Sequence, residues 1–297
     1  MRAPLLLVPV VVLALAGCSV PQTDNAGDGV LRIVASTNVY GAIAQEIAGD
    51  HAEVTSIIDD PQQDPHEFEA NGRVQLALSR ADIVIVNGGG YDDFASTLLA
   101  ASGNDAARVL DAVELSGYDA QAQGFNEHVF YDYPTMQTVA KAIGAALDIA
   151  DPGNATTYDG RTDGVVAELQ ALIQLEGSIA ASSAGAGVVI TEPVPLYVLL
   201  ACRLDDLTPP EFSAAIEEGT DVPPALLQSV LNLIGDGSAD VVVYNAQTGG
   251  PQTDALLDVA SENGVPAIGV SEVLPHDQSY LEWQTRLLTE LQQALAR

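Results

Sequence analysis

The feature that most constrains the fold is a repeated alternation of short apolar runs with helical patterns. In the first half of the chain, three such runs predict strands, and four longer segments show helical periodicity. The strands are predicted at residues 31–35, 54–58 and 83–86, and the helices at 39–48, 71–79, 91–101 and 134–147. Strands that alternate with helices are typical of parallel sheets with crossover helices. This half therefore predicts one α/β lobe.

A long stretch without any strand signal follows, from about residue 157 to residue 181. Apolar residues recur there at Val165, Leu169, Leu172 and Ile179, close to the three-to-four spacing of an amphipathic helix. We expect one long helix that links the first lobe to a second.

The alternation then returns and predicts a second α/β lobe. Strands are expected at residues 188–191, 241–244 and 267–270, and helices at 196–201, 226–234, 253–263 and 279–296. Thr208-Pro209-Pro210-Glu211 has the pattern of a capping box with proline at the first helical position, so another helix should begin there. The predicted fold is α/β, with two Rossmann-like lobes, parallel sheets, one long linking helix and a ligand in the cleft between the lobes.

The N-terminus has the layout of a secretory signal. Arg2 is followed by an apolar run over residues 5–15, too short for the roughly 20 residues that a membrane-spanning helix needs. Leu15-Ala16-Gly17-Cys18 has the form of a bacterial lipobox, which predicts cleavage before Cys18 and lipidation of its thiol. The alternative is an ordinary signal peptide cut nearby. A lipid on Cys18 would anchor the chain to the cell membrane on its extracytoplasmic side.

These signals predict five segments. Residues 1–17 form the signal peptide, and residues 18–29 form the lipidated Cys with a polar, flexible tether. The remaining residues are too many for a domain with a single hydrophobic core and match two lobes of ordinary domain size. We expect an N-terminal lobe over residues 30–150, the linking helix over 151–185 and a C-terminal lobe over 186–297.

The charge of the chain excludes some partners. Ten basic residues stand against 41 acidic ones, for a formal charge of -31. Such a surface repels nucleic acid and anionic substrates and attracts cations, although solubility alone would also account for it. The second cysteine, Cys202, lies among aliphatic residues and is expected to be a structural core residue.

Four histidines are present, and two of them stand in polar settings that follow predicted strands. These are His66 and His128, whereas His51 precedes a strand and is expected in a solvated turn. Ligands of open parallel sheets bind beyond the carboxyl ends of the strands. His66 and His128 are therefore candidate ligating residues.

The residues around these histidines resemble the zinc- and manganese-binding lipoproteins of bacterial ABC importers, the cluster A-I solute-binding proteins. Asp64-Pro65-His66-Glu67-Phe68-Glu69 is similar to that family's first ligand motif, and Asn126-Glu127-His128-Val129-Phe130-Tyr131-Asp132 to its second. Thr191-Glu192-Pro193-Val194-Pro195-Leu196-Tyr197 resembles the third, in which a His or Glu stands five residues before a Tyr. The resemblance runs from Val30 to the C-terminus and includes the lipobox.

This resemblance implies His66, His128 and Glu192 as the first three metal ligands. The fourth ligand of the family is typically an Asp after the penultimate strand, and this chain has Glu272 directly beyond that strand. We take Glu272 as the fourth ligand, with His276 and Asp277 as alternatives.

Two imidazoles and two carboxylates from both lobes would close a site around a borderline divalent ion. Such a set excludes a thiolate-type copper(I) site and suits Zn²⁺ or Mn²⁺, between which the sequence does not decide. The resemblance implies a monomeric binding protein, not an enzyme, that captures the ion as cargo for an ABC permease and its ATPase. The alternatives are a metalloenzyme with the same ligands, and a solute-binding protein for a haem or siderophore, or an adhesin.

Two glycine-containing turns also stand near predicted strand ends. Asn87-Gly88-Gly89-Gly90 follows a strand as a phosphate-binding loop would, but no Gly-Lys-Ser/Thr sequence follows it. We expect a turn beside the cleft. Thr248-Gly249-Gly250-Pro251 is expected to open a helix and is a candidate for lining the cleft.

Overall fold

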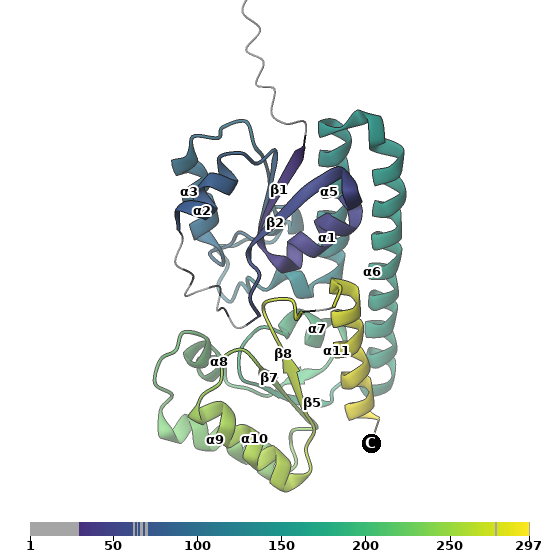
Figure 1. Ribbon diagram of the computed structural model, residues 1–297. Coiled ribbons are helices and arrows are strands. Elements are labelled where there is room, and N and C mark those ends of the chain that lie inside the picture. Colours follow the sequence, from purple (N-terminus) through teal and green to yellow (C-terminus); the bar gives the residue numbers. More distant parts are fainter. Residues whose placement is uncertain are drawn as a thin grey trace, which may run out of the picture.

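The computed structural model describes residues 30–61, 63, 65, 68, 71–276 and 278–296. Within these residues the chain forms two α/β lobes, stacked one above the other (Figure 1). The N-terminal sheet contains β1 (Leu31–Thr37), β2 (Ala52–Ile58), β3 (Ile83–Val86) and β4 (Arg108–Asp111), in the order β2-β1-β3-β4. All of its pairings are parallel, as the alternation of strands and helices predicts.

Helices cover both faces of this sheet because successive side chains of its strands point to opposite sides. Ile33 and Ala35 pack into the large core, whereas Val34 between them packs into a smaller core on the other face. The large core is covered by α1 (Asn38–Ala48) and α5 (Tyr133–Ala150), and the smaller one by α2 (Gly72–Leu78) and α3 (Asp93–Ser102).

The C-terminal sheet repeats this arrangement. It contains β5 (Gly187–Ile190), β6 (Asp205–Asp206), β7 (Val241–Asn245) and β8 (Ala267–Val270), all parallel and in the order β6-β5-β7-β8. One face packs against α8 (Pro210–Glu217), α9 (Pro224–Gly235) and α10 (Pro251–Asn263), and the other against α7 (Leu196–Ala201) and α11 (Tyr280–Leu295). In both sheets the first strand in sequence lies second in space.

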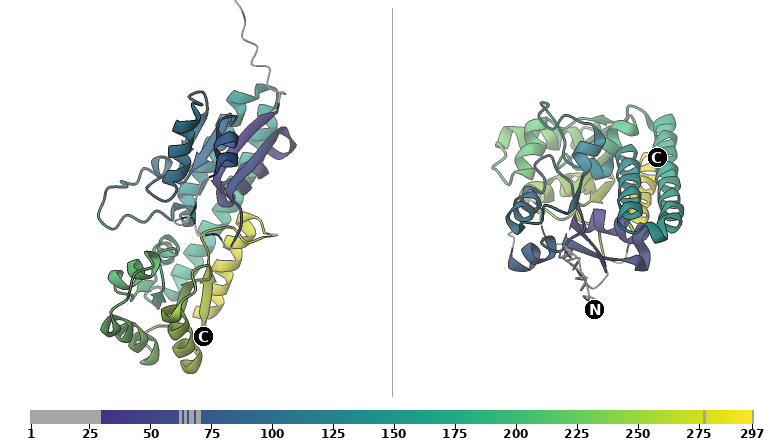
Figure 2. Two further views of the ribbon diagram at one scale, coloured as in Figure 1. Left: turned by 60° about the vertical axis from the view of Figure 1, so that its left-hand side comes forward. Right: turned by 90° about the horizontal axis from the view of Figure 1, so that it is seen from above.

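The predicted linking helix is α6 (Ala155–Ser183), which runs along both lobes (Figure 1). Its 29 residues span about 43 Å at 1.5 Å per residue. The buried stripe contains the four predicted apolar residues and three more: Tyr158, Thr162 and Glu176. Seen from above, α5 and α6 lie side by side (Figure 2). The large core is continuous from one lobe to the other along α6, so the lobes share much of their packing.

The remaining short elements are α4 (Ala112–Ser116) and the 3₁₀ turns Gly49–His51, Val129–Tyr131 and Pro152–Asn154. His51 lies in the first of these turns and is exposed, as predicted. Cys202 is fully buried beside α7, as expected of a core residue. In the described ranges, no helix combines the length and the apolarity that crossing a membrane requires.

One predicted motif is wrong in its details. A helix does begin after Thr208, but Thr208 does not cap it; Pro209 occupies the N-cap position. The Thr208 hydroxyl instead accepts a hydrogen bond of 2.8 Å from the backbone N–H of Ile190 in β5. The side chain that the sequence pattern predicted to cap the helix is therefore hydrogen-bonded to the sheet instead.

Candidate metal centre

Three predicted ligands lie where the two lobes meet. His128 precedes the Val129–Tyr131 turn of the N-terminal lobe, Glu192 follows β5, and Glu272 follows β8. All three are almost inaccessible to solvent, with exposed fractions of 0%, 2% and 2%. His66, Asp277 and Cys18 lie outside the described residues.

The imidazole of His128 faces two carboxylates of the C-terminal lobe. Its Nε2 lies 3.5 Å from Oε2 of Glu272 and 3.7 Å from Oε1 of Glu217, the last residue of α8. Sequence reasoning predicted the first of these carboxylates and missed the second. The described structure therefore brings an imidazole from one lobe against two carboxylates from the other.

The side chain of Asn126 orients His128. Its Nδ2 donates to the carbonyl oxygen of Pro193 at 3.0 Å, which leaves Oδ1 facing the histidine. This oxygen accepts from the backbone N–H of His128 and lies 2.7 Å from Nδ1 of the ring. Because an amide oxygen only accepts, Nδ1 carries a proton and Nε2 is the atom directed at the carboxylates. This is how proteins prepare a histidine for metal ligation.

Asn245, at the end of β7, holds the two predicted carboxylate ligands together. Its Nδ2 donates to Oε2 of Glu192 at 2.7 Å and to Oε1 of Glu272 at 3.0 Å. The hydroxyl of Thr248 donates to the other oxygen of Glu192. These donors keep two negative groups side by side in a buried place, where an unsatisfied charge is costly.

The turn that carries Glu272 is tied to both lobes. Gln247 of the C-terminal lobe accepts from the backbone N–H groups of Glu272 and Val273. From the other lobe, Asn38 exchanges two hydrogen bonds of 2.9 Å with the backbone of Leu274. Hydrogen bonds from both lobes thus hold the backbone of this turn in place.

The charges in the site act on one another. Burial alone lowers the pKa of His128, but the hydrogen bond and charge of Glu272 and the charges of Glu217 and Glu127 raise it above its ordinary value. Burial raises the pKa of Glu192, and hydrogen bonds from Thr248 and Asn245 offset part of that increase. A positive charge on the imidazole is therefore favoured, as expected where carboxylates surround it.

The alternatives for the fourth ligand differ in burial. His276 is exposed, whereas Glu272 is buried and contacts His128. In the part of the chain that the structure describes, no three His, Cys, Asp or Glu side chains are grouped so that they could hold a metal ion. The described residues thus present prospective ligands, and the completion of the shell is part of the proposal below.

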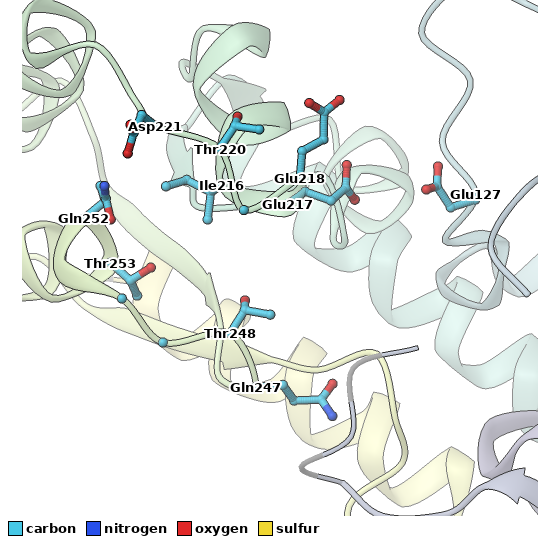
Figure 3. A pocket seen from close by; sticks show the side chains of 13 residues that line it. Glu127, Ile216, Glu217, Glu218, Thr220, Asp221, Gln247, Thr248, Gln252 and Thr253 are labelled. Atoms are coloured by element: carbon cyan, nitrogen blue, oxygen red, sulfur yellow. The ribbon is translucent and has the colours of Figure 1, made fainter. Parts of the chain in front are cut away.

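A polar cleft of about 860 Å³ lies beside the candidate site, and Glu217, Gln247 and Thr248 are among the residues that line it. We call it the α8 cleft; it lies between the end of α8, the loop before α10, and Glu127 (Figure 3). The loop contributes Thr248, as predicted for the glycine turn. Among the described residues that line the cleft, none is aromatic, Lys or Arg. Such a lining suits a cation and offers nothing to stack or neutralise a haem or an anionic siderophore.

The other glycine turn does not cradle a phosphate. The backbone N–H groups of Asn87 and Gly88 donate to the carboxylate of Asp92, at 2.6 and 2.8 Å. Gly88 has φ +77°, and its position touches Asp111, so a Cβ atom would collide there. The loop closes on itself and is a turn, as expected.

Several residues of the site were not predicted. Asn245 could have been found, because it is a polar residue that ends a buried strand at the carboxyl edge of a parallel sheet. Asn126 stands two residues before a candidate ligand, which is also a detectable signal. Glu217 lies next to Glu218 at the end of an amphipathic helix and has no such signal.

Comparison with known proteins agrees with the fold and the family resemblance. The chain matches the model of the family described as "Zinc-uptake complex component A periplasmic" over residues 33–294. It is 28% identical over 171 residues to the manganese-binding lipoprotein MntA of Halalkalibacterium halodurans, covering 56% of this chain and 55% of that protein. The iron ABC transporter substrate-binding lipoprotein MtsA of Streptococcus pyogenes is also 28% identical over 171 residues, covering 54% and 55%. The matches span about half the length of these relatives.

Solved structures share the fold over almost the whole chain. The periplasmic zinc-binding protein TroA from Treponema pallidum superposes with a TM-score of 0.74 at 18% identity, covering 91% of this chain and 100% of that one. The solute-binding protein FpvC from Pseudomonas aeruginosa, solved in complex with Mn²⁺, gives 0.71 at 22% identity, covering 90% and 98%. Family model and fold together confirm the resemblance seen in the motifs: the chain belongs to the family of periplasmic component A of zinc-uptake complexes.

Proposed function

We propose that this protein captures a divalent transition metal ion outside the cytoplasm and delivers it to an ABC importer. The observation that carries the proposal is the contact of His128 with Glu272 and Glu217 where the lobes meet, with Glu192 tied to Glu272 through Asn245. An imidazole beside several carboxylates is a donor set for Zn²⁺ or Mn²⁺. The names of the relatives, which include manganese-binding and iron-transport lipoproteins, support the same class of cargo.

We propose His66, His128, Glu192 and Glu272 as the ligands. Among the described residues, the contact of His128 with Glu272 and the hydrogen bonds of Asn245 to Glu192 and Glu272 support the last three. For His66, support comes from Pro61, whose carbonyl oxygen accepts a hydrogen bond from Gln247, the residue that also holds the Glu272 turn. His66 follows Pro61 by five residues, a reach of up to roughly 17 Å in an extended chain.

We propose binding and not catalysis. Glu192 and Glu272 are buried and are held by hydrogen bonds from Asn245 and Thr248, so the arrangement favours enclosing an ion over presenting it to a substrate. Four protein ligands would leave no open position for the water that a catalytic zinc site needs. The shared core along α6 and the bonds between the lobes favour small movements on loading.

The lipid anchor belongs to the same proposal. Cys18 would carry the lipid, and about a dozen tether residues would separate it from Val30, where the described chain begins. Such a tether would keep a monomeric receptor on the outer side of the membrane, near the permease and its ATPase. The lipoprotein names of the relatives support this location.

The test is calorimetric titration of the chelated protein with Zn²⁺ and with Mn²⁺, followed by metal analysis. We expect one ion per chain. His128→Ala should lower the affinity by at least about a hundredfold, because the loss of a ligand costs at least as much as the loss of a residue that only orients one. His51→Ala, at an exposed histidine, is the matched control and should bind like the wild type. Binding of neither ion, or full binding by His128→Ala, would refute the proposal.

A further inference from the structure

Glu217 is a carboxylate that touches the candidate centre from a place where the family resemblance implies no ligand. It ends α8, a helix whose Phe212 is fully buried in the C-terminal core. The buried side of the helix fixes the backbone, and Glu217 extends from its last turn to within 3.7 Å of Nε2 of His128.

The distances around His128 match those of ligands that share one ion. Zn–N and Zn–O bonds are about 2.1 Å long, so two ligand atoms at a tetrahedral angle stand roughly 3.4 Å apart. Glu272 and Glu217 lie 3.5 and 3.7 Å from the same imidazole nitrogen. Each carboxylate, taken singly, therefore stands at a spacing from this nitrogen that a metal ion can bridge.

Glu217 also differs from Glu272 in its access to solvent. The side chain of Glu217 is 17% exposed and lines the α8 cleft, whereas that of Glu272 is 2% exposed and does not. Figure 3 shows Glu217 and Glu127 on separate segments of the chain that border this cleft. An ion that enters through the cleft meets Glu217 before it meets Glu272.

We propose that Glu217 is an additional ligand that selects for Mn²⁺ over Zn²⁺, an inference that rests on the metal-binding function proposed above. Zinc sites in proteins are usually complete with four ligands in a tetrahedron. Manganese prefers more ligands, most of them oxygen. A further carboxylate, added to the four proposed ligands, therefore contributes more to the binding of Mn²⁺ than to that of Zn²⁺.

The test compares Glu217→Gln with Glu218→Gln. The two changes remove the same charge from neighbouring positions of the α8 cleft, but Glu218 is exposed and does not contact His128 in the described structure. Affinities for Mn²⁺ and Zn²⁺ are measured by calorimetry with the full chain at one pH and salt concentration. Circular dichroism of the metal-free variants checks that both are folded.

We expect Glu217→Gln to weaken Mn²⁺ binding by about tenfold to a hundredfold and Zn²⁺ binding by less than about threefold. Glu218→Gln should change neither affinity by more than about twofold, because an exposed charge is screened. Equal losses for the two ions, or equal behaviour of the two variants, would overturn the role of Glu217. If the wild type bound neither ion, the proposed function itself would fail, which is a distinguishable result.

Discussion

Replacing Glu176 by Gln should remove a pH-dependent loss of stability that is built into the linking helix. Glu176 is the one charged residue in the buried stripe of α6 and is only 4% exposed. Burial, and then the charge of Asp132, raise the pKa of its carboxyl to about 8. Tyr133 and Tyr280 lie within electrostatic reach of Glu176 and burial raises the pKa of both, so they stay neutral and supply no positive charge to offset it.

The sign follows from proton binding. The folded chain holds a proton on Glu176 up to about pH 8, whereas the unfolded chain releases it near 4.5. Since the folded state binds more protons between these values, stability is highest below pH 4.5 for this group and falls as the pH rises through 8. At about 1.4 kcal/mol per pH unit, the loss at pH 7 is about 3 kcal/mol.

The assay is thermal unfolding of metal-free wild type and Glu176→Gln at pH 5 and at pH 8. On the same basis the loss grows by about 3.5 kcal/mol between pH 5 and pH 8, which corresponds to roughly 7–14 °C in Tm for a chain of this size. The variant should therefore gain several degrees over the wild type at pH 8 and much less at pH 5. Glu168→Gln, at an exposed position of the same helix, is the control and should gain little at either pH. Equal gains for Glu176→Gln at both pH values would refute the reasoning.

Three further predictions concern the site and the core. Asn245→Ala should weaken metal binding by about tenfold to a hundredfold, because it leaves Glu192 and Glu272 without their shared donor; Asn263→Ala, at the exposed end of α10, should not. Metal affinity should rise with pH until His128 loses its proton, because its raised pKa makes a proton compete with the ion for the imidazole. Titrations in buffers of different ionisation enthalpy would detect the released proton, and an affinity that does not change with pH would contradict this. Burial raises the pKa of Cys202 to about 12, so its thiol should react with a disulfide reagent only after unfolding, and rapid labelling of the native protein would count against its burial.

Much of the fold follows from local patterns. The apolar runs of β3 and β8 and the stripe of α6 are periodic signals that packing does not override. β6 could not be predicted in the same way, because its two residues, Asp205 and Asp206, become a strand only by pairing with β5. Thr208 was misassigned for a similar reason: its nearest partner in space belongs to a strand 18 residues earlier.

The site also contains residues that the sequence predicts and residues that only the tertiary packing brings there. His128, Glu192 and Glu272 follow motifs that can be recognised in sequence, and they are brought together through Asn245 and direct contact. In the sequence, Glu217 looks like an ordinary solvent-exposed Glu at the end of a helix. It lies near His128 only because α8 packs against the core of the C-terminal lobe. The place of Glu272 directly beyond a strand already favours it over His276, and its burial, which a sequence pattern does not report, agrees with that prediction.

The most direct test of the account is anomalous diffraction from crystals of the chelated protein after reloading with Zn²⁺ or Mn²⁺. The account predicts one strong anomalous peak where the two lobes meet, within bonding distance of Nε2 of His128 and of the carboxylates of Glu192 and Glu272. In the Mn²⁺ crystals, Glu217 should also contact the ion. A peak confined to surface carboxylates, or no peak near His128, would contradict the central claim that both lobes enclose the metal.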